Sequence, residues 1–91
     1  MNKQQIEAAS KILKAIANEN RLKVLYLISE REMSVGEIEA LLNLSQSALS
    51  QHLAVLRSEH IVKTRRVAQT IFYGIKNEKV RELLHMLSVL F

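Results

Sequence analysis

Uncharged hydrogen-bonding side chains gather on one side of the segment 45–59. At about 100° per residue, this side lies opposite an apolar stripe of Leu49, Leu53 and Leu56. Amide side chains can pair with adenine edges, and hydroxyls can donate to or accept from either type of base pair. A face without long charged side chains can also enter the major groove of DNA, which is about 12 Å wide. The residues predicted to read bases are Gln46, Ser47, Ser50 and Gln51.

The alternative for this face is that its serines and glutamines are ordinary surface residues. A helix exposed only to solvent normally carries Lys and Glu at such positions, whereas this face continues with Ala54 and Ser58 and is flanked by Arg57. The cluster as a whole therefore favours a role at DNA over simple solubility.

Positive charge is concentrated in the same third of the chain. From Leu44 to Lys76 there are five basic residues and a single acidic one, Glu59, so this third carries the whole net charge of +4. Such a concentration is the footprint of a surface that binds a polyanion. The residues predicted to contact the DNA backbone or minor groove are Ser45, His52, Arg57, Lys63, Arg65, Arg66 and Gln69. Two alternatives stay open: the basic residues could serve solubility, and His52, between the buried and exposed faces, could instead pack locally.

Other chemistries find little support in the residues present. The chain has no cysteine, which excludes disulfides, zinc–thiolate sites and thiol redox switching. His60 and His85 each lack a neighbouring Cys or Asp, and a single histidine is a poor set of metal ligands. No nucleophile–base pair, glycine-rich phosphate loop or carboxylate pair stands out. We predict no metal, no cofactor and no enzymatic activity.

Periodicity places helices and strands around these side chains. Apolar residues recur at helical spacing over about 4–17, 19–31 and 77–91, and Asn77 is expected to cap the last of these helices. The stretches 61–67 and 70–75 are rich in Val, Ile, Thr, Phe and Tyr, which predicts the two strands of a hairpin. The turn between the strands lacks the Asn-Gly signal of a tight turn, so we expect a longer loop.

A helix-turn-helix is predicted over about 34–59. Ser34 and Glu37 form a capping-box pattern that begins its first helix, and Asn43 stands where a residue in left-handed conformation would end that helix. Ser45 is expected to cap the second helix. The predicted buried face of the first helix consists of Ile38, Leu41 and Leu42.

The expected fold class follows from the order of four helices, a hairpin and a final helix. It is mainly α with a β-hairpin, a winged helix-turn-helix whose wing covers about 61–75. The 91 residues form at most one domain, spanning 1–91. With no proline and only two glycines, the connections between elements must be short.

The helices expected at about 4–17 and 77–91 carry more apolar surface than one small core can cover. Of all residues 48% are hydrophobic, and a chain of this length is only marginally stable alone. Left exposed, the two stripes would form a large patch of the kind that marks an interface. We predict a homodimer that pairs through Ile6, Leu13, Leu83, Leu84, Leu87, Leu90 and Phe91. Two-fold pairing would set two recognition helices about one DNA turn apart, over an imperfect palindrome.

The stretch from Ser34 to Ser58, SVGEIEALLNLSQSALSQHLAVLRS, resembles the signature of ArsR/SmtB-type transcriptional repressors. The upstream AIANENRLKVLYLI and the downstream TIFYGI fit the same family, so the similarity covers nearly the whole chain. The second wing strand, QTIFY, is similar to that of the HlyU/BigR-like subgroup. The resemblance implies a winged-helix homodimer that binds a promoter palindrome and either represses transcription or displaces another silencing protein.

The resemblance also implies where members of the family sense their signals. The positions of a Cys-x-Cys metal site, of an Asp-x-His metal site and of a sulfur- or oxidant-sensing cysteine pair correspond here to Ser34 and Gly36, to Asn77 and Lys79, and to Tyr26 and Val89. These residues cannot replace the thiolates and imidazoles that such sites need. The expected regulator is therefore neither a metal sensor nor a thiol sensor of these kinds, and the sequence leaves its inducer open.

Two other interpretations compete with this one. A winged helix can bind proteins instead of DNA, although such a module would not need its whole net charge on the recognition helix and wing. A DNA-binding chain could also hold an effector pocket outside the family pattern. Neither a signal-peptide-like apolar run nor a stretch of about 20 apolar residues is present, so we expect a cytoplasmic, nucleoid-associated protein.

Overall fold

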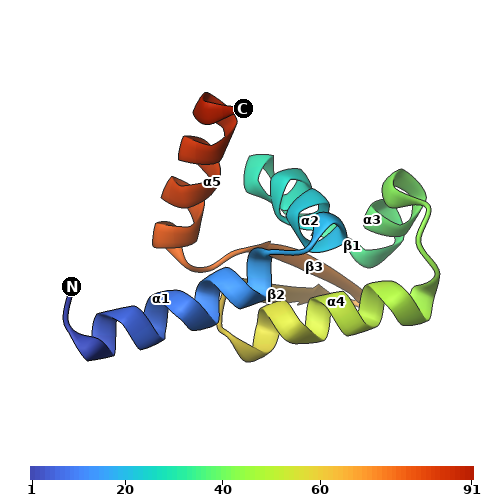
Figure 1. Cartoon of the computed structure of the whole chain (residues 1–91). Coiled ribbons are helices and arrows are strands. Elements are labelled where there is room, and N and C mark those ends of the chain that lie inside the picture. The colour runs from blue at the N-terminus through green and yellow to red at the C-terminus, as the bar shows by residue number, and fades with distance from the viewer.

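The computed structural model describes all 91 residues, Met1–Phe91. Its elements are α1 (Lys3–Ile16), α2 (Glu19–Glu30), β1 (Met33–Ser34), α3 (Val35–Leu42), α4 (Gln46–Ser58), β2 (Val62–Val67), β3 (Thr70–Ile75) and α5 (Glu78–Leu90). In Figure 1, α1 and α4 run along the lower side of the molecule, α2 and α3 lie above them, and α5 rises at the left with the C-terminus at its tip. The predicted winged helix-turn-helix is confirmed, and each predicted helix or strand ends within one residue of the observed one.

Helix α3 begins and ends, and helix α4 begins, at the capping residues that the sequence predicts. Ser34 and Glu37 form the predicted capping box, in which each side chain accepts from the backbone N–H of the other residue. That N–H of Ser34 lowers the pKa of the Glu37 carboxyl below its ordinary value, because the hydrogen bond favours the ionised form. Asn43 has φ 54° and ψ 41°, the left-handed conformation expected at the end of α3. Ser45 caps α4 by accepting from the Ala48 N–H.

One core of 16 buried hydrophobic residues holds the helices against the sheet. The helix α4 contributes its three predicted leucines, none more than 3% exposed: Leu49, Leu53 and Leu56. On α3, Ile38 is fully buried and Leu42 is half-buried, but Leu41 is 60% exposed. The prediction of Leu41 as a buried residue is therefore wrong. Leu41 lies about 60° around the helix from Ile38 and about 100° from Leu42, on the edge of α3 that faces solvent.

The sheet has the strand order β1-β3-β2, and its shortest strand was not predicted. Met33 pairs with Tyr73, and Ser34 pairs with Phe72. A strand of two residues shows no alternation in the sequence, so only its pairing with β3 identifies it. This pairing brings the end of α2 to the outer edge of the wing.

The wing turn is tighter than the sequence indicates. Val67 pairs with Thr70, which leaves a loop of only two residues, Ala68 and Gln69. The prediction of a longer loop is wrong. Ala68 has φ 56° and supplies the positive φ that a two-residue hairpin turn requires. Glycine, asparagine or aspartate usually fills this position, which is why the sequence carried no signal for a tight turn.

Candidate nucleic-acid interface

The exposed side of α4 carries the residues predicted to read bases. Gln46, Ser47, Ser50 and Gln51 are all exposed. They belong to the first two turns of α4, which the Ser45 cap fixes and the buried leucine stripe holds against the core. Ala54 and Ser58 continue the same exposed side toward the end of the helix. The structure thus brings the four predicted residues onto one polar, uncharged surface.

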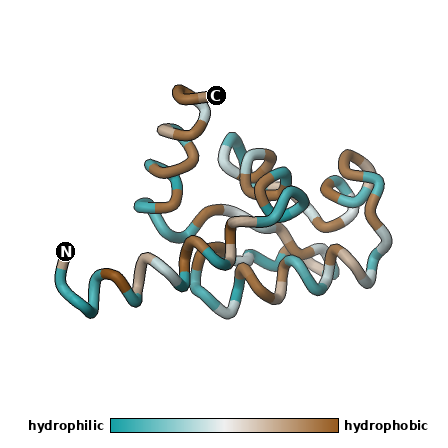
Figure 2. Tube along the Cα trace, in the orientation of Figure 1, coloured by the Kyte–Doolittle hydropathy of each residue, from teal (hydrophilic) through white to brown (hydrophobic).

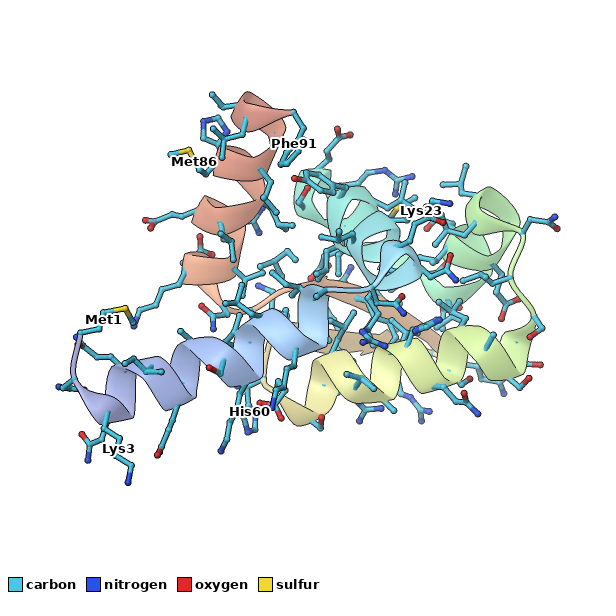
Figure 3. The ribbon with its side chains drawn as sticks, in the orientation of Figure 1. Met1, Lys3, Lys23, His60, Met86 and Phe91 are labelled. Carbon is cyan, nitrogen blue, oxygen red and sulfur yellow. The ribbon has the colours of Figure 1, made fainter.

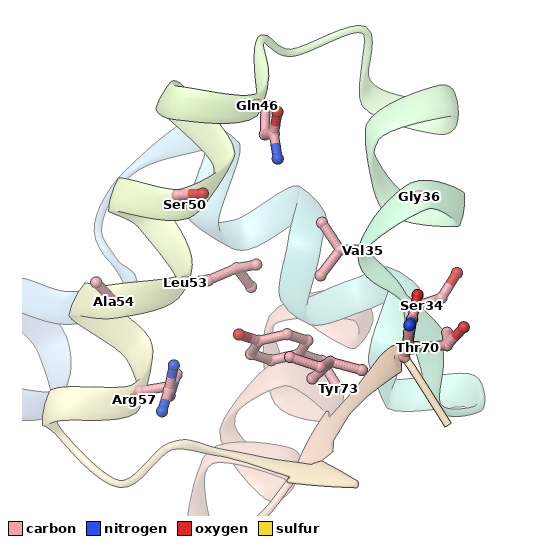
Figure 4. A pocket seen from close by; sticks show the side chains of 12 residues that line it. Ser34, Val35, Gly36, Gln46, Ser50, Leu53, Ala54, Arg57, Thr70 and Tyr73 are labelled. Carbon is pink, nitrogen blue, oxygen red and sulfur yellow. The ribbon is translucent and has the colours of Figure 1, made fainter. Parts of the chain in front are cut away.

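An open groove of 610 Å³ runs beside this surface, between α4, the start of α3 and the wing; we call it the wing groove. Figure 4 shows Gln46, Ser50, Ala54 and Arg57 along the α4 wall. The opposite wall and the floor are formed by Ser34, Val35, Gly36, Leu53, Gln69, Thr70, Ile71 and Tyr73. No carboxylate lines the wing groove. Arg57 forms no ion pair within the chain, so its guanidinium is available to an anion.

His52 is engaged within the chain. Its Nδ1 lies 3.3 Å from Nη1 of Arg21, and this nitrogen must accept because a guanidinium can only donate. Arg21 also donates to the backbone carbonyls of Lys14 and Ala15 at the end of α1. The half-buried His52 ring therefore links α4 to α1 and α2, which is the local packing role that the sequence left open for it.

The basic side chains of the wing are divided between its two faces. Lys63 and Arg65 alternate along β2 and share one face, opposite Gly74 and Phe72 of β3. Arg66 pairs with Ile71, which lines the wing groove, so Arg66 lies on the face of the hairpin that is turned toward α4. Every residue of β2 after Val62 is exposed, whichever face of the hairpin it lies on. Gln69 lies in the turn and borders the wing groove.

Arg65 has partners that the sequence did not reveal. Its Nε lies 2.8 Å from Oε1 of Glu32, and its guanidinium carbon lies 4.9 Å from the centroid of the Phe72 ring. Glu32 reaches Arg65 because β1 pairs with β3, across 33 positions of sequence. The charge of Arg65 is thus partly compensated, whereas Lys63 and Arg66 form no ion pair.

Away from α4, the two terminal helices present an exposed apolar face. Of the residues predicted for the interface, Ile6, Leu13, Leu90 and Phe91 are each at least half exposed, and Leu83 and Leu87 are half-buried. Figure 2 shows hydrophobic segments along the outer part of α5, and Figure 3 shows Phe91 and Met86 near its tip. An open, largely apolar groove of 690 Å³, the α1–α5 groove, lies between the two helices and is lined by Ile12, Leu13, Val80 and Leu83 among others. None of the helices has the length and apolar character needed to cross a membrane.

Leu84 does not belong to this exposed face. It is 2% exposed and is part of the core of its own chain. Its carbonyl accepts a hydrogen bond of 2.6 Å from the Tyr26 hydroxyl, and Arg81 donates to the Ser29 carbonyl, also at 2.6 Å. These bonds fix α5 to α2. The prediction of Leu84 as an interface residue is corrected accordingly: it lies on the inner side of the stripe that anchors α5.

Comparison with known proteins agrees with this geometry. Residues 18–64, which run from the start of α2 to the first half of β2, match the model of "Bacterial regulatory protein, arsR family". The chain belongs to the arsR family. It is 46% identical to the transcriptional activator HlyU of Vibrio cholerae, over all of this chain and 88% of that protein. It is 42% identical to a biofilm growth-associated repressor of Agrobacterium fabrum, over all of this chain and 77% of that protein.

Solved structures of arsR-family proteins share the fold over nearly the whole chain. HlyU of Vibrio cholerae superposes with a TM-score of 0.93, covering 100% of this chain and 98% of that one. A homodimeric winged helix-turn-helix DNA-binding domain from Mycobacterium bovis, 26% identical, superposes with a TM-score of 0.87 over 99% of this chain and 86% of that one. This arsR-family chain is accordingly a DNA-binding transcriptional regulator. No three His, Asp or Glu side chains gather where they could hold a metal ion.

Proposed function

We propose that this arsR-family regulator binds an imperfect palindrome in promoter DNA as a homodimer, and thereby represses transcription or displaces another silencing protein. The observation that carries the proposal is the exposed, uncharged polar side of α4 beside a groove that no carboxylate lines. In the proposed complex, the first turns of α4 enter the major groove, where Gln46, Ser47, Ser50 and Gln51 meet base edges. In the same proposed complex, the residues that contact the sugar–phosphate backbone of the DNA are Ser45, Arg57, Lys63, Arg65, Arg66 and Gln69.

A second copy of the chain is the occupant that we propose for the exposed apolar face. The residues that form it are Ile6, Leu13, Leu83, Leu87, Leu90 and Phe91, with the α1–α5 groove between them. The homodimeric state of the Mycobacterium bovis relative supports this choice. A two-fold axis through these helices would place two α4 helices on successive major grooves, about one DNA turn apart.

We further propose that the regulator does not sense metals or thiols in the ways known for the family. The chain has no cysteine, and the family resemblance implies that Ser34, Gly36, Asn77 and Lys79 correspond to the ligand positions of metal-sensing members. Tyr26, which the resemblance places at one position of the sensing cysteine pair, instead donates a hydrogen bond from α2 to the Leu84 carbonyl of α5. Any inducer would have to act through other groups.

Gln51→Ala is expected to relax sequence preference. A bidentate amide–adenine pair contributes about 1–3 kcal/mol of discrimination against the wrong base, so one position in each half-site should lose most of its preference. The operator would first be selected from random duplex DNA by the purified protein, and binding would then be measured on that sequence and its single-base variants. Gln4→Ala, the same change on the exposed side of α1, is the matched control. Unchanged preference in Gln51→Ala would refute the base-reading role.

Arg66→Ala is expected to weaken binding to all duplex sequences by a similar factor. Removing one phosphate interaction lowers the slope of log affinity against log salt by about 0.9, and the substitution would act at both half-sites of the dimer. Arg65→Ala should act in the same direction but more weakly, because Glu32 already compensates its charge. Titrations of operator and unrelated DNA at several salt concentrations measure both effects. A wild-type salt slope in Arg66→Ala would count against a phosphate interaction there.

A further inference from the structure

The hydroxyl of Tyr73 forms no hydrogen bond with any other group of the chain. The side chain is only 5% exposed and its ring forms part of the core, but the tyrosine also lines the wing groove. No residue of the chain forms a hydrogen bond with the hydroxyl, and the hydroxyl is not sealed from solvent. Figure 4 shows it pointing across the wing groove toward α4. Tyr73 thus holds a free donor and acceptor at the floor of the groove.

Tyr73 combines a ring buried in the core with a hydroxyl that is open to the wing groove. Buried tyrosine hydroxyls usually find a partner, and the other tyrosine of this chain, Tyr26, donates to the Leu84 carbonyl at 2.6 Å. An unpaired hydroxyl on a rigid, buried ring is positioned without further loss of side-chain entropy. It is therefore suited to a ligand that enters the wing groove from outside.

The other groups of the wing groove indicate the charge of that ligand. Arg57 extends from the α4 wall without an ion-pair partner, and Ser50 and Thr70 line the groove from opposite walls. No acidic side chain is among the lining residues. A guanidinium with several hydroxyl donors and no carboxylate is a set that binds phosphate oxygens.

We propose that the wing groove holds the sugar–phosphate backbone of one DNA strand, and that the Tyr73 hydroxyl donates to a phosphate oxygen there while Arg57 supplies the positive charge. This inference rests on the proposed function, because Gln46 and Ser50 are both rim residues of the groove and predicted base readers. When α4 lies in the major groove, the strand that borders it on the wing side must pass over this rim. Tyr73 thereby fixes the depth and register of α4 without reading a base.

Tyr73→Phe tests the interaction, because it keeps the ring in the core and removes only the hydroxyl. We expect about tenfold weaker binding per groove, as for the loss of a hydrogen bond to a charged group, and equally for operator and unrelated duplex. The salt slope should stay at its wild-type value, since a neutral donor releases no counterion. Arg57→Gln, in contrast, should lower both affinity and slope. Ser29→Ala is the control, since it removes a hydroxyl that bonds only the Tyr26 carbonyl within α2, away from the wing groove, and should leave DNA affinity unchanged.

A second measurement separates the phosphate interaction from any change in folding. Operators in which single phosphates are replaced by neutral methylphosphonates would be titrated with both proteins. At one phosphate in each half-site, the replacement should weaken wild-type protein more than Tyr73→Phe. Wild-type affinity in Tyr73→Phe, or equal losses at every phosphate, would overturn the proposal. If Gln51→Ala still changes sequence preference, the proposed function survives such a result.

Discussion

Leu49→Ala is expected to lower the free energy of unfolding by about 2–5 kcal/mol, the range seen when a buried leucine is truncated and leaves a cavity. Leu49 is fully buried at the point where α4 docks on the core. Small domains have only about 5–15 kcal/mol of stability in total, so this single change would remove a large share of it. The measurement is urea-induced unfolding at one fixed protein concentration, because the stability of a dimer depends on concentration.

The matched control is Leu41→Ala, which removes the same atoms from the other helix of the helix-turn-helix. Leu41 is 60% exposed, and surface substitutions generally change stability by less than about 0.5 kcal/mol. The two leucines look equivalent in the sequence, since both belong to apolar stripes of helical spacing. Equal losses of stability in the two variants would contradict the burial pattern described above.

The features that the sequence predicted are those fixed by neighbouring residues. The capping box of Ser34 and Glu37, the left-handed Asn43 and the leucine stripe of α4 each depend on interactions within about one or two turns of helix. Helix and strand ends could therefore be placed closely. The exposed side of α4 could be predicted for the same reason, because a helix with one buried stripe has its opposite side determined by geometry alone.

The features that were missed depend on the tertiary arrangement. The ion pair of Arg65 with Glu32 exists only because β1 pairs with β3. The free hydroxyl of Tyr73 acquires meaning only from the wing groove, whose walls come from three separate elements. In the sequence, Tyr73 is one of several apolar and aromatic strand residues, and nothing distinguishes it from a plain core residue.

The apolar stripe of α5 is a further feature that the sequence could not resolve without the tertiary arrangement. Leu83, Leu84 and Leu87 are spaced as one apolar face, and the sequence assigned all three to the interface. In the fold, the stripe is wide enough to serve two surfaces: Leu84 and Val80 pack inward on the core, while Leu90 and Phe91 remain exposed. Periodicity gives the width of an apolar stripe but does not show which part a partner covers.

Leu13→Glu is expected to dissociate the proposed dimer. Leu13 is 51% exposed on α1 and lines the α1–α5 groove, so the monomer fold can accept a charge there. In a two-fold interface every substitution occurs twice, and each unpaired carboxylate taken out of water costs several kcal/mol. With about 1.4 kcal/mol per factor of ten, the dimer dissociation constant should rise at least about a thousandfold. Sedimentation at micromolar concentration would then show a monomer.

The effect on DNA should be large and specific to the full palindrome. Two linked recognition units gain about 10²–10⁴ in affinity over one, and Leu13→Glu would lose this gain on the full site while binding a half-site about as well as one wild-type unit does. Leu41→Glu places the same charge on an exposed leucine outside the terminal helices and should leave the oligomeric state unchanged. If Leu13→Glu sediments as a dimer, the partner must sit elsewhere, and the spacing proposed for the two α4 helices loses its basis. If both variants dissociate, added charge rather than the α1–α5 groove would be responsible.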